Sequence, residues 1–328
     1  KWYPEWGKDR LQSMVVERAD WCISRQRKWG VPIPVVYCKD CGKEIIDDGI
    51  MQKVSDIFGE EGSDAWFAHD AEYFLPEGFE CPHCHKANGF EKETDIMDVW
   101  FDSGSSHAAV LKNRNYLKWP ADVYLEGADQ YRGWFQSSLL TSVAAGNRAP
   151  YEQIITHGWT VDGEGRKMSK SLGNGIAPQE IIDKYGADIL RLWVASADYH
   201  ADIRISPEIL KQISDNYRKI RNTARYCLGN LYDFDPDKDM VANDELEELD
   251  KYALMKLDEV IKTARAGYDE YEYHTTAHAL HNFCVVDMSN FYFDVLKNRL
   301  YTTAPDSKSR RAAQTVLYKV LDALTLVL

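Results

Sequence analysis

A strand–helix–strand pattern in the middle of the chain restricts the fold more than any other stretch. The runs Asp122–Glu126 and Gln153–His157 predict two strands, and Ala128–Ala145 between them predicts a helix. Such a crossover is right-handed and joins parallel strands of one sheet. Because ligands of open parallel sheets bind beyond the carboxyl ends of the strands, we expect a binding site near Glu126 and His157.

Three side chains are expected to line this sheet edge. Gln130 and Trp134 are four residues apart in the first turns of the predicted helix, which puts them on one face close to Glu126. A carboxylate, an amide and an indole together suit a small amphiphilic ligand. In the alternative interpretation, Glu126 interacts with the helix dipole and Trp134 packs in the core.

A glycine-flanked basic segment, Lys167–Ser171 with the sequence KMSKS, follows His157 by about ten residues. We call this segment the lysine loop. Glycines at 163, 165, 173 and 175 allow close backbone approach, while two lysines and two hydroxyl groups suit phosphate oxygens. The segment therefore predicts a phosphate-binding loop at the same sheet edge. A solvated basic loop without a ligand is the alternative.

Two CxxC motifs, Cys38–Cys41 and Cys81–Cys84, predict a structural Zn²⁺ site with four sulfur ligands: Cys38, Cys41, Cys81 and Cys84. The chain has seven cysteines, an odd number that does not indicate a disulfide framework. Four thiolates would leave no open metal position, which argues against catalytic zinc. A redox pair or idle thiols are the alternatives.

Two further stretches suggest binding surfaces. Trp21–Gly30 interleaves cations, including Arg25 and Arg27, with two indoles, a mixture that suits a phosphate-rich partner. A charged helix end packed by tryptophans would have the same composition. Asp98–His107 passes from an apolar run into a Gly/Ser turn and resembles the rim of a pocket, although Trp100 is also a candidate core residue.

From Pro207 the sequence predicts amphipathic helices that form a bundle, spanning roughly 207–228, 244–268, 274–298 and 308–328. Arg218 and Arg221 are among the cations of the first helix. The last helix is still apolar where the sequence stops, so we expect the chain to be cut within a larger bundle.

Composition narrows the class of protein further. The 328 residues are 45% hydrophobic and 28% charged, as in an ordinary globular protein. A net charge of −13 argues against unspecific binding of nucleic acid over the whole surface. No apolar run is long enough for a membrane span, and the first residues do not resemble a signal peptide. We expect a monomer in the cytoplasm that does not contact membranes.

Several motifs, in order along the chain, resemble those of the class I aminoacyl-tRNA synthetases, and among them most closely the isoleucine-specific enzymes. The resemblance covers essentially the whole chain and rests on four segments: Trp21–Pro34, Trp100–His107, Glu126–Phe135 and the lysine loop.

This resemblance implies a two-step reaction, in which isoleucine and ATP with Mg²⁺ form isoleucyl-adenylate and the acyl group then moves to tRNA. It implies that Lys167 and Lys170 act on the leaving pyrophosphate. It also assigns the other site residues, as follows: Glu126, Gln130, Trp100 and Trp134 would bind the substrate, His157, Gly158 and Ser169 would join both lysines in binding ATP, and Arg25, Arg27, Arg218 and Arg221 would contact tRNA.

The chain also departs from the family pattern. It has neither the HIGH-type tetrad nor the long editing insertion, so we expect an inactive fragment of a full enzyme.

The expected fold class is α/β: the second half of a Rossmann-like parallel sheet with a zinc-knuckle insertion, followed by a helical bundle. The expected domains are 1–37, the start of this half; 38–95, the zinc knuckles; 96–206, the sheet and lysine loop; and 207–328, a partial anticodon-binding bundle. A valine- or leucine-specific relative, or a noncatalytic zinc and tRNA-binding module, is the alternative.

Overall fold

The computed structural model describes residues 1–87 and 89–328 and divides into two compact units, Lys1–Ile155 and Thr156–Leu328. Each unit has its own buried apolar clusters. The fold is therefore described one unit at a time.

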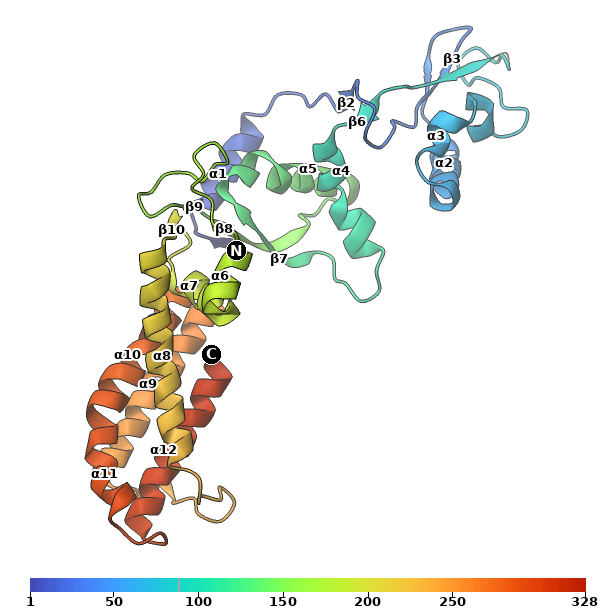
Figure 1. Cartoon of the computed structure of the whole chain (residues 1–328). Coiled ribbons are helices and arrows are strands. Elements are labelled where there is room, and N and C mark those ends of the chain that lie inside the picture. Colours follow the sequence, from blue (N-terminus) through green and yellow to red (C-terminus); the bar gives the residue numbers. More distant parts are fainter. Residues whose placement is uncertain (88) are drawn as a thin grey trace. The chain divides into compact units, whose positions relative to one another are not determined.

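The sheet of the first unit contains both strands predicted from the crossover. Its order is β1-β8-β7, of which β7 and β8 are labelled in Figure 1. Strand β1 lies parallel to β8, with Trp2 opposite Ile154. The strands span β1 (Trp2–Tyr3), β7 (Ala121–Gly127) and β8 (Tyr151–His157). Side chains from α1 (Gly7–Val16) and α5 (Trp134–Gly146) pack with the sheet residues Tyr124 and Ile154 in one apolar cluster.

The connection after β7 differs from the single helix that the sequence predicts. Ala128–Arg132 form a 3₁₀ helix, the chain bends at Gly133, and α5 begins at Trp134. Gly133 has φ −123° and ψ −119°, and a Cβ there would lie 2.5 Å from Gln130 Oε1 and 2.9 Å from Trp100 Cη2. The prediction of a continuous helix over 128–145 was wrong because this close approach requires a bend at a glycine.

The cysteine-bearing region of the first unit is a small sheet covered by short helices (Figure 1). Trp66 and Phe74 are fully buried there, with ring centroids 4.7 Å apart. Asp47 begins α2 by accepting hydrogen bonds from the backbone N–H groups of Gly49 and Ile50. The elements are β3 (Val36–Cys38), which lies between β4 (Glu44–Ile45) and β5 (Phe90–Lys92), with α2 (Asp48–Glu61), α3 (Ala65–Ala68) and the 3₁₀ turn Ala71–Phe74.

A two-stranded ribbon and a short helix complete the first unit. The antiparallel strands are β2 (Ser24–Arg25) and β6 (Ile96–Met97). They lead to α4 (Val99–Gly104), followed by a π-helical segment, His107–Lys112. Gly104 permits the helices to approach, since a Cβ there would lie 2.9 Å from the Ser137 carbonyl carbon of α5.

The second unit begins with two short parallel strands, β9 (Thr160–Val161) and β10 (Ile203–Arg204). Between them lie α6 (Pro178–Tyr185), which has proline in its first turn, and α7 (Ala187–Ser196). Gly186, with φ +93°, separates the two helices and supplies a conformation that other residues rarely adopt.

The rest of the second unit is a bundle of helices that run alongside one another (Figure 1). Ser206 caps the first of them through the Ile209 backbone N–H. The helices are α8 (Pro207–Gly229), α9 (Glu248–Asp269), α10 (Tyr273–Asn282), the π-helical segment Phe283–Tyr292, α11 (Phe293–Tyr301) and α12 (Lys308–Val327), with a 3₁₀ turn at Asn243–Glu245. Among the described residues, every helix is too short or too polar to traverse a bilayer. The predicted fold class is confirmed.

Candidate functional site

In the first unit the structure brings Trp100, Gln130 and Trp134 together around the bend at Gly133. The Trp100 ring lies directly against the Gly133 backbone. The Gln130 side-chain oxygen accepts a hydrogen bond of 3.0 Å from the Trp134 backbone N–H, so it satisfies one of the free donors at the start of α5. Gln130 and Trp134 therefore meet through a hydrogen bond from backbone to side chain and not through the spacing of one helix.

The indole of Trp134 is fixed by a second contact. Its Nε1–H donates to the Ser103 carbonyl oxygen at 2.9 Å and approaches Ser106 Oγ at 3.3 Å. These partners belong to the stretch Asp98–His107, which the sequence marks as a pocket rim. The rim and the first turn of α5 are thus joined by hydrogen bonds.

Glu126 lies at the end of β7 with an exposed side chain. Tyr124, which belongs to the apolar cluster, and Gly127 are buried, whereas Leu125 and Glu126 between them are both exposed. An exposed carboxylate at the carboxyl end of a strand is available to a cationic ligand group.

Trp100 lines two cavities of the first unit and is 44% exposed. A cavity of about 350 Å³ adjoins Arg25, Arg27 and Trp29. A cavity of about 250 Å³ is lined by three arginines, Arg18, Arg25 and Arg132, together with Trp21 and Trp100. The surroundings of Trp100 are thus cationic and aromatic, as the sequence around Trp21–Gly30 suggested.

Asp98 organises the cations beside Trp100. Arg25 Nη2 forms an ion pair with Asp98 Oδ2 at 2.6 Å, and Trp21 Nε1 donates to the same oxygen at 3.0 Å. Burial opposes ionisation of Asp98, but the N–H donors of Trp21 and Trp100 and the charge of Arg25 outweigh it and lower its pKa. Arg25 is therefore held inward, whereas Arg27 is exposed. Asp98 begins the stretch predicted as a pocket rim, but no role was predicted for its side chain.

In the second unit, His157 is the last residue of β8 and Gly158 follows it. His157 Nδ1 donates to the Gly158 carbonyl oxygen at 2.7 Å, which fixes the ring. Gly158 is required by packing, because a Cβ there would lie 2.4 Å from the carbonyl atoms of Ala201. The Gly158 N–H donates to the Tyr199 carbonyl oxygen at 2.8 Å, so this backbone is rigidly placed.

The lysine loop exposes its polar groups and anchors its one apolar side chain. Met168 packs against a cluster that includes Trp193 and Leu210. Lys167 Nζ lies 4.9 Å from the centre of the Trp159 ring, whereas Lys170 is exposed and has no ion-pair partner among the residues that the structure describes. Ser169 Oγ accepts a hydrogen bond of 3.2 Å from the Leu172 N–H.

Two residues beside the lysine loop, Asp162 and Asn174, were missed as functional candidates. They are hydrogen-bonded to each other at 2.9 Å across the intervening segment. The signal was present in the sequence, since Asp-Gly at 162–163 and Asn-Gly at 174–175 are turn dipeptides whose side chains bind nearby backbone groups.

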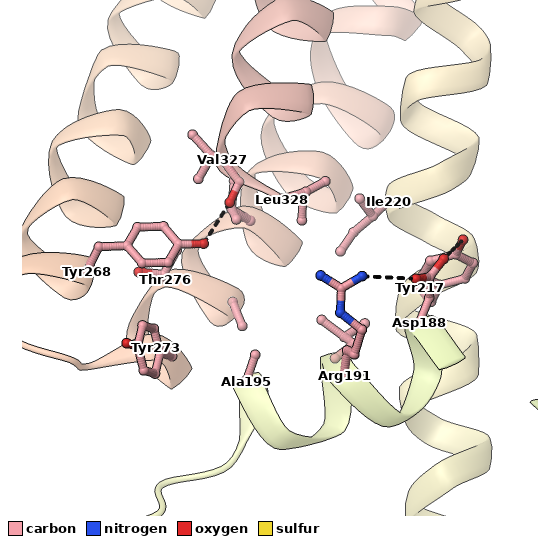
Figure 2. Close-up of a pocket in the computed structure, with 13 residues that line it drawn as sticks. Asp188, Arg191, Ala195, Tyr217, Ile220, Tyr268, Tyr273, Thr276, Val327 and Leu328 are labelled. Carbon is pink, nitrogen blue, oxygen red and sulfur yellow. Dashed lines mark hydrogen bonds and ion pairs between the residues drawn. The ribbon is translucent and has the colours of Figure 1, made fainter. Parts of the chain in front are cut away.

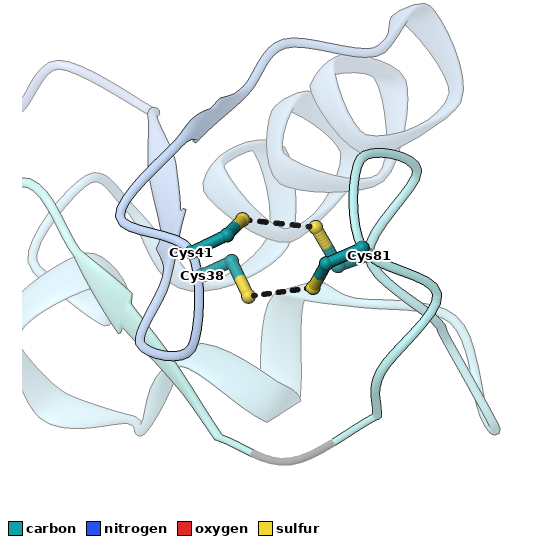
Figure 3. A group of neighbouring side chains, drawn as sticks. Cys38, Cys41 and Cys81 are labelled. Atoms are coloured by element: carbon teal, nitrogen blue, oxygen red, sulfur yellow. Dashed lines mark hydrogen bonds between the residues drawn. The ribbon is translucent and has the colours of Figure 1, made fainter.

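The four predicted zinc ligands converge on one point (Figure 3). Their sulfur atoms all lie within 4.8 Å of one another, and the Cys38–Cys84 and Cys41–Cys81 sulfur separations are both 3.7 Å. Tetrahedral Zn²⁺ with bonds of about 2.3 Å requires sulfur atoms about 3.8 Å apart. The cysteines therefore fit a structural zinc ion.

The pKa values of the clustered thiols are shifted in opposite directions. Although the Lys86 backbone N–H lowers it, burial and hydrogen bonds with Cys38 and Cys81 raise the pKa of Cys84 to about 12. Burial raises the pKa of Cys81, but the backbone N–H groups of His83 and Cys84 outweigh it and lower that pKa to about 6. The His83 N–H donates to Cys81 Sγ at 3.4 Å. Thiolates are the form that binds zinc, so these donors favour the liganding state.

A cavity of about 370 Å³ in the second unit contains none of the predicted site residues (Figure 2). It is mainly apolar, and its polar groups are engaged: Tyr268 Oη donates to the Val327 carbonyl oxygen at 2.7 Å, and Arg191 pairs with Asp188 at 3.5 Å. The chemistry-bearing motifs thus lie elsewhere. On α8, Arg218 pairs with Asp215, and Arg221 is exposed.

Comparison with known proteins identifies the family. Residues 1–206 match the profile of the class I tRNA synthetases for isoleucine, leucine, methionine and valine, and residues 250–328 match the anticodon-binding domain of tRNA ligases. The chain belongs to the class I tRNA synthetases.

Within this family, similarity is high to isoleucine–tRNA ligases. The chain is 62% identical over 98% of its length to the enzyme of Caldanaerobacter subterraneus subsp. tengcongensis, and 60% identical over its full length to that of Caldicellulosiruptor bescii. It spans 34% and 36% of these two relatives, about a third of their length.

Solved structures share the fold at low identity. Mycobacterium tuberculosis methionyl-tRNA synthetase in complex with methionyl-adenylate matches 99% of the chain and 55% of its own, with a TM-score of 0.68 and 19% identity. The leucyl enzyme of Agrobacterium radiobacter, in its ternary complex, matches 94% of the chain and 38% of its own, with a TM-score of 0.63 and 22% identity. These likenesses support the Rossmann-like assignment.

Proposed function

We propose that the chain supplies the ATP- and adenylate-binding part of an enzyme that activates isoleucine and transfers it to tRNA. The observation that carries this proposal is the lysine loop, which presents the exposed Lys170 on a segment anchored by Met168. The identity of about 60% to isoleucine–tRNA ligases along the chain supports isoleucine as the substrate.

In the first step, an isoleucine carboxylate oxygen forms a bond to the α-phosphorus of ATP while the bond from that phosphorus to the bridging oxygen breaks. Pyrophosphate leaves with the bond electrons. Lys167 and Lys170 stabilise the negative charge that grows on it, and Ser169 hydrogen-bonds its oxygens. Mg²⁺ bound to the phosphates supplies additional charge neutralisation. His157 and the Gly158 backbone contact the nucleotide.

Four residues of the first unit bind the amino acid and its adenylate in this proposal. The exposed carboxylate of Glu126 pairs with the ammonium group of isoleucine, and Gln130 hydrogen-bonds to the adenylate. Trp100 and Trp134 surround the aliphatic side chain. Arg25, Arg27, Arg218 and Arg221 contact tRNA phosphates, and the last three of these arginines are exposed.

Zn²⁺ held by Cys38, Cys41, Cys81 and Cys84 would have a structural role, because four sulfur ligands exclude a bound water. The proposed domains keep the boundaries 1–37, 38–95, 96–206 and 207–328. The proposed protein is a cytoplasmic monomer.

The proposal is tested by amino-acid-dependent exchange of pyrophosphate into ATP, measured on the protein at its full encoded length. Isoleucine should support exchange far better than valine or leucine. Preferential activation of either of the latter would assign a different specificity, and no exchange with any of the three would favour a noncatalytic zinc and tRNA-binding module. We propose further that residues 1–328 alone are inactive, and robust exchange by this chain would contradict that statement.

A further inference from the structure

The carboxylate of Asp162 is saturated with hydrogen bonds at the base of the lysine loop. Oδ1 accepts from the backbone N–H groups of Glu164 at 3.0 Å and Arg166 at 2.8 Å. Oδ2 accepts from Arg166 Nε and from Asn174 Nδ2, both at 2.9 Å. Asp162 is only 7% exposed, so its position is fixed on all sides.

The amide of Asn174 completes the connection on the far side of the loop. Its Nδ2 donates to Asp162 and also lies 3.3 Å from the Lys167 carbonyl oxygen. Its Oδ1 accepts a hydrogen bond of 2.9 Å from the Ser169 backbone N–H. One side chain thus holds the backbone immediately before and after Met168.

These contacts fix the backbone and leave the ammonium groups accessible. Residues between Ser169 and Gly173 form a tight turn, in which the Gly173 N–H donates to the Ser169 carbonyl oxygen at 3.1 Å and Gly173 has φ +61°. Lys170 is exposed on this turn, and within the part of the chain that the structure describes the Asp162 carboxylate forms no hydrogen bond or ion pair with either lysine amino group. Any effect of Asp162 on phosphate chemistry would therefore pass through the loop backbone.

We infer that Asp162 and Asn174 form a clasp that positions Lys167 and Lys170 for adenylate formation, which makes both of them positioning residues. The inference rests on the proposed function of the lysine loop. The clasp supplies in advance the loop geometry that phosphate stabilisation requires, so its loss should slow the chemical step more than it weakens isoleucine binding.

The charge state of Asp162 agrees with this arrangement. The Asn174 amide and the Arg166 backbone N–H, with the Arg166 guanidinium, hold the pKa of Asp162 well below its ordinary value despite partial burial. An ionised carboxylate can accept all four hydrogen bonds. A neutral asparagine would turn its NH₂ group toward the donors of Arg166 or Asn174.

The surrounding fold does not depend on the clasp alone. Val161 pairs with Arg204 in the parallel β9–β10 ladder and forms an antiparallel bridge with Lys167, and Met168 is held by its apolar cluster. Variants at Asp162 and Asn174 should therefore fold while their lysine loop becomes less ordered.

The experiment compares pyrophosphate exchange by Asp162→Asn, Asn174→Asp and the double exchange of both residues in the full-length protein. Each single variant should lower kcat roughly 10- to 100-fold with little change in the KM for isoleucine. In the double variant, the amide at position 162 can donate to the carboxylate at position 174, so one hydrogen bond of the pair is restored in the reverse direction. Its kcat should therefore be at least several-fold higher than that of either single variant. Asp183→Asn is the matched control, because Asp183 is exposed on α6 and accepts a hydrogen bond from Gln179.

A comparison with Lys170→Ala separates a positioning role of the clasp from a general effect on the stability of the protein. In the Lys170→Ala background, Asn174→Asp should have a much smaller effect, since a main target of the clasp is gone. The inference would be overturned if the single variants had the kcat of the wild type. It would also be overturned if Asn174→Asp lowered kcat by the same factor in the Lys170→Ala background as in the wild type. Failure of the proposed function looks different, because the wild-type protein itself would then show no amino-acid-dependent exchange.

Discussion

Trp134 lies parallel to Tyr124, with ring centroids 4.0 Å apart and an angle of 3° between the ring planes. Tyr124 is buried in β7, and its hydroxyl group is 3.0 Å from Ser138 Oγ on α5. One face of the indole is therefore occupied by the sheet, and its N–H is held by Ser103. In the proposed amino-acid site, Trp134 acts as a rigid wall that the protein has already oriented.

Replacement of Trp134 by Phe should weaken isoleucine binding. The smaller ring loses the hydrogen bond to Ser103 and part of the stacked surface, and a loss of about 1.4 kcal/mol would raise the KM for isoleucine roughly tenfold. Pyrophosphate exchange over a range of isoleucine concentrations measures this change. Trp6→Phe, at an indole 44% exposed, is the control and should leave the KM unchanged. An unaltered KM in Trp134→Phe would remove Trp134 from the amino-acid site.

The sequence predicted those parts of the molecule that depend on local patterning. The boundaries of α6, α7 and α8 follow from Pro178, Gly186 and Ser206, which are start and stop signals at the helix ends. The two CxxC motifs predicted the cysteine cluster because each tight turn directs its thiols to one side.

Other features depend on contacts between distant residues and were not predictable in this way. The bend at Gly133 exists because Trp100, more than thirty positions earlier, needs the space that a Cβ would occupy. The clasp of Asp162 and Asn174 joins residues twelve positions apart through an irregular loop. Hydrophobic periodicity carries no information on such contacts.

Removal of the Lys170 ammonium group should slow adenylate formation. Lys170→Ala is expected to lower kcat for isoleucine-dependent pyrophosphate exchange roughly 100-fold or more, because one charge that stabilises the transition state is lost. Lys211→Ala is a suitable control, since Lys211 is an exposed lysine of α8 outside the loop. Unchanged exchange kinetics in Lys170→Ala would favour the noncatalytic binding module.

The cysteine cluster should bind about one zinc ion per chain, and Cys84→Ser should abolish most of this binding. Metal content of the purified protein is measured by atomic emission, and loss of the metal should lower the unfolding temperature because zinc binding contributes folding free energy. Cys22→Ser is the control, as Cys22 is an exposed cysteine outside the cluster. A metal-free wild-type protein with unchanged stability after addition of zinc would contradict the prediction.

Burial of His107 should make the first unit less stable in acid. Desolvation, with a smaller contribution from the charge of Lys112, lowers the pKa of His107 in the folded protein. As pH falls below about 6.5, the ordinary pKa, the unfolded chain takes up the proton first, so the free energy of unfolding decreases until pH has passed the folded pKa.

The His107→Gln variant isolates this contribution. Glutamine does not titrate and can still hydrogen-bond to Thr141, which lies 3.2 Å from His107 Nε2. Urea unfolding at about pH 7.5 and about pH 5.5 should show a smaller loss of stability in the variant than in the wild type. Equal losses in the two proteins would show that His107 does not contribute to the acid sensitivity.

In the helical bundle, the ion pair between Asp250 and Arg299 should contribute strongly to stability. The guanidinium group binds both carboxylate oxygens, at 2.8 and 2.7 Å, and Tyr292 Oη donates to Asp250 Oδ1 at 2.5 Å. The Asp250 side chain is 0% exposed and that of Arg299 is 12% exposed. Arg299→Met would leave the carboxylate buried without its cation, and such a loss typically costs about 3–5 kcal/mol.

Lys297→Met is the matched control on the same helix, because the Lys297–Asp294 pair is well exposed, at 61% and 68%, and solvent screening should leave it little contribution to stability. Urea unfolding followed by far-UV circular dichroism measures both variants. A cost for Arg299→Met no larger than that for Lys297→Met would mean that Tyr292 and the helix N-terminus suffice to stabilise Asp250. A large difference would instead identify the Arg299 guanidinium as the group that allows α9 to begin with a buried charge in its first turn.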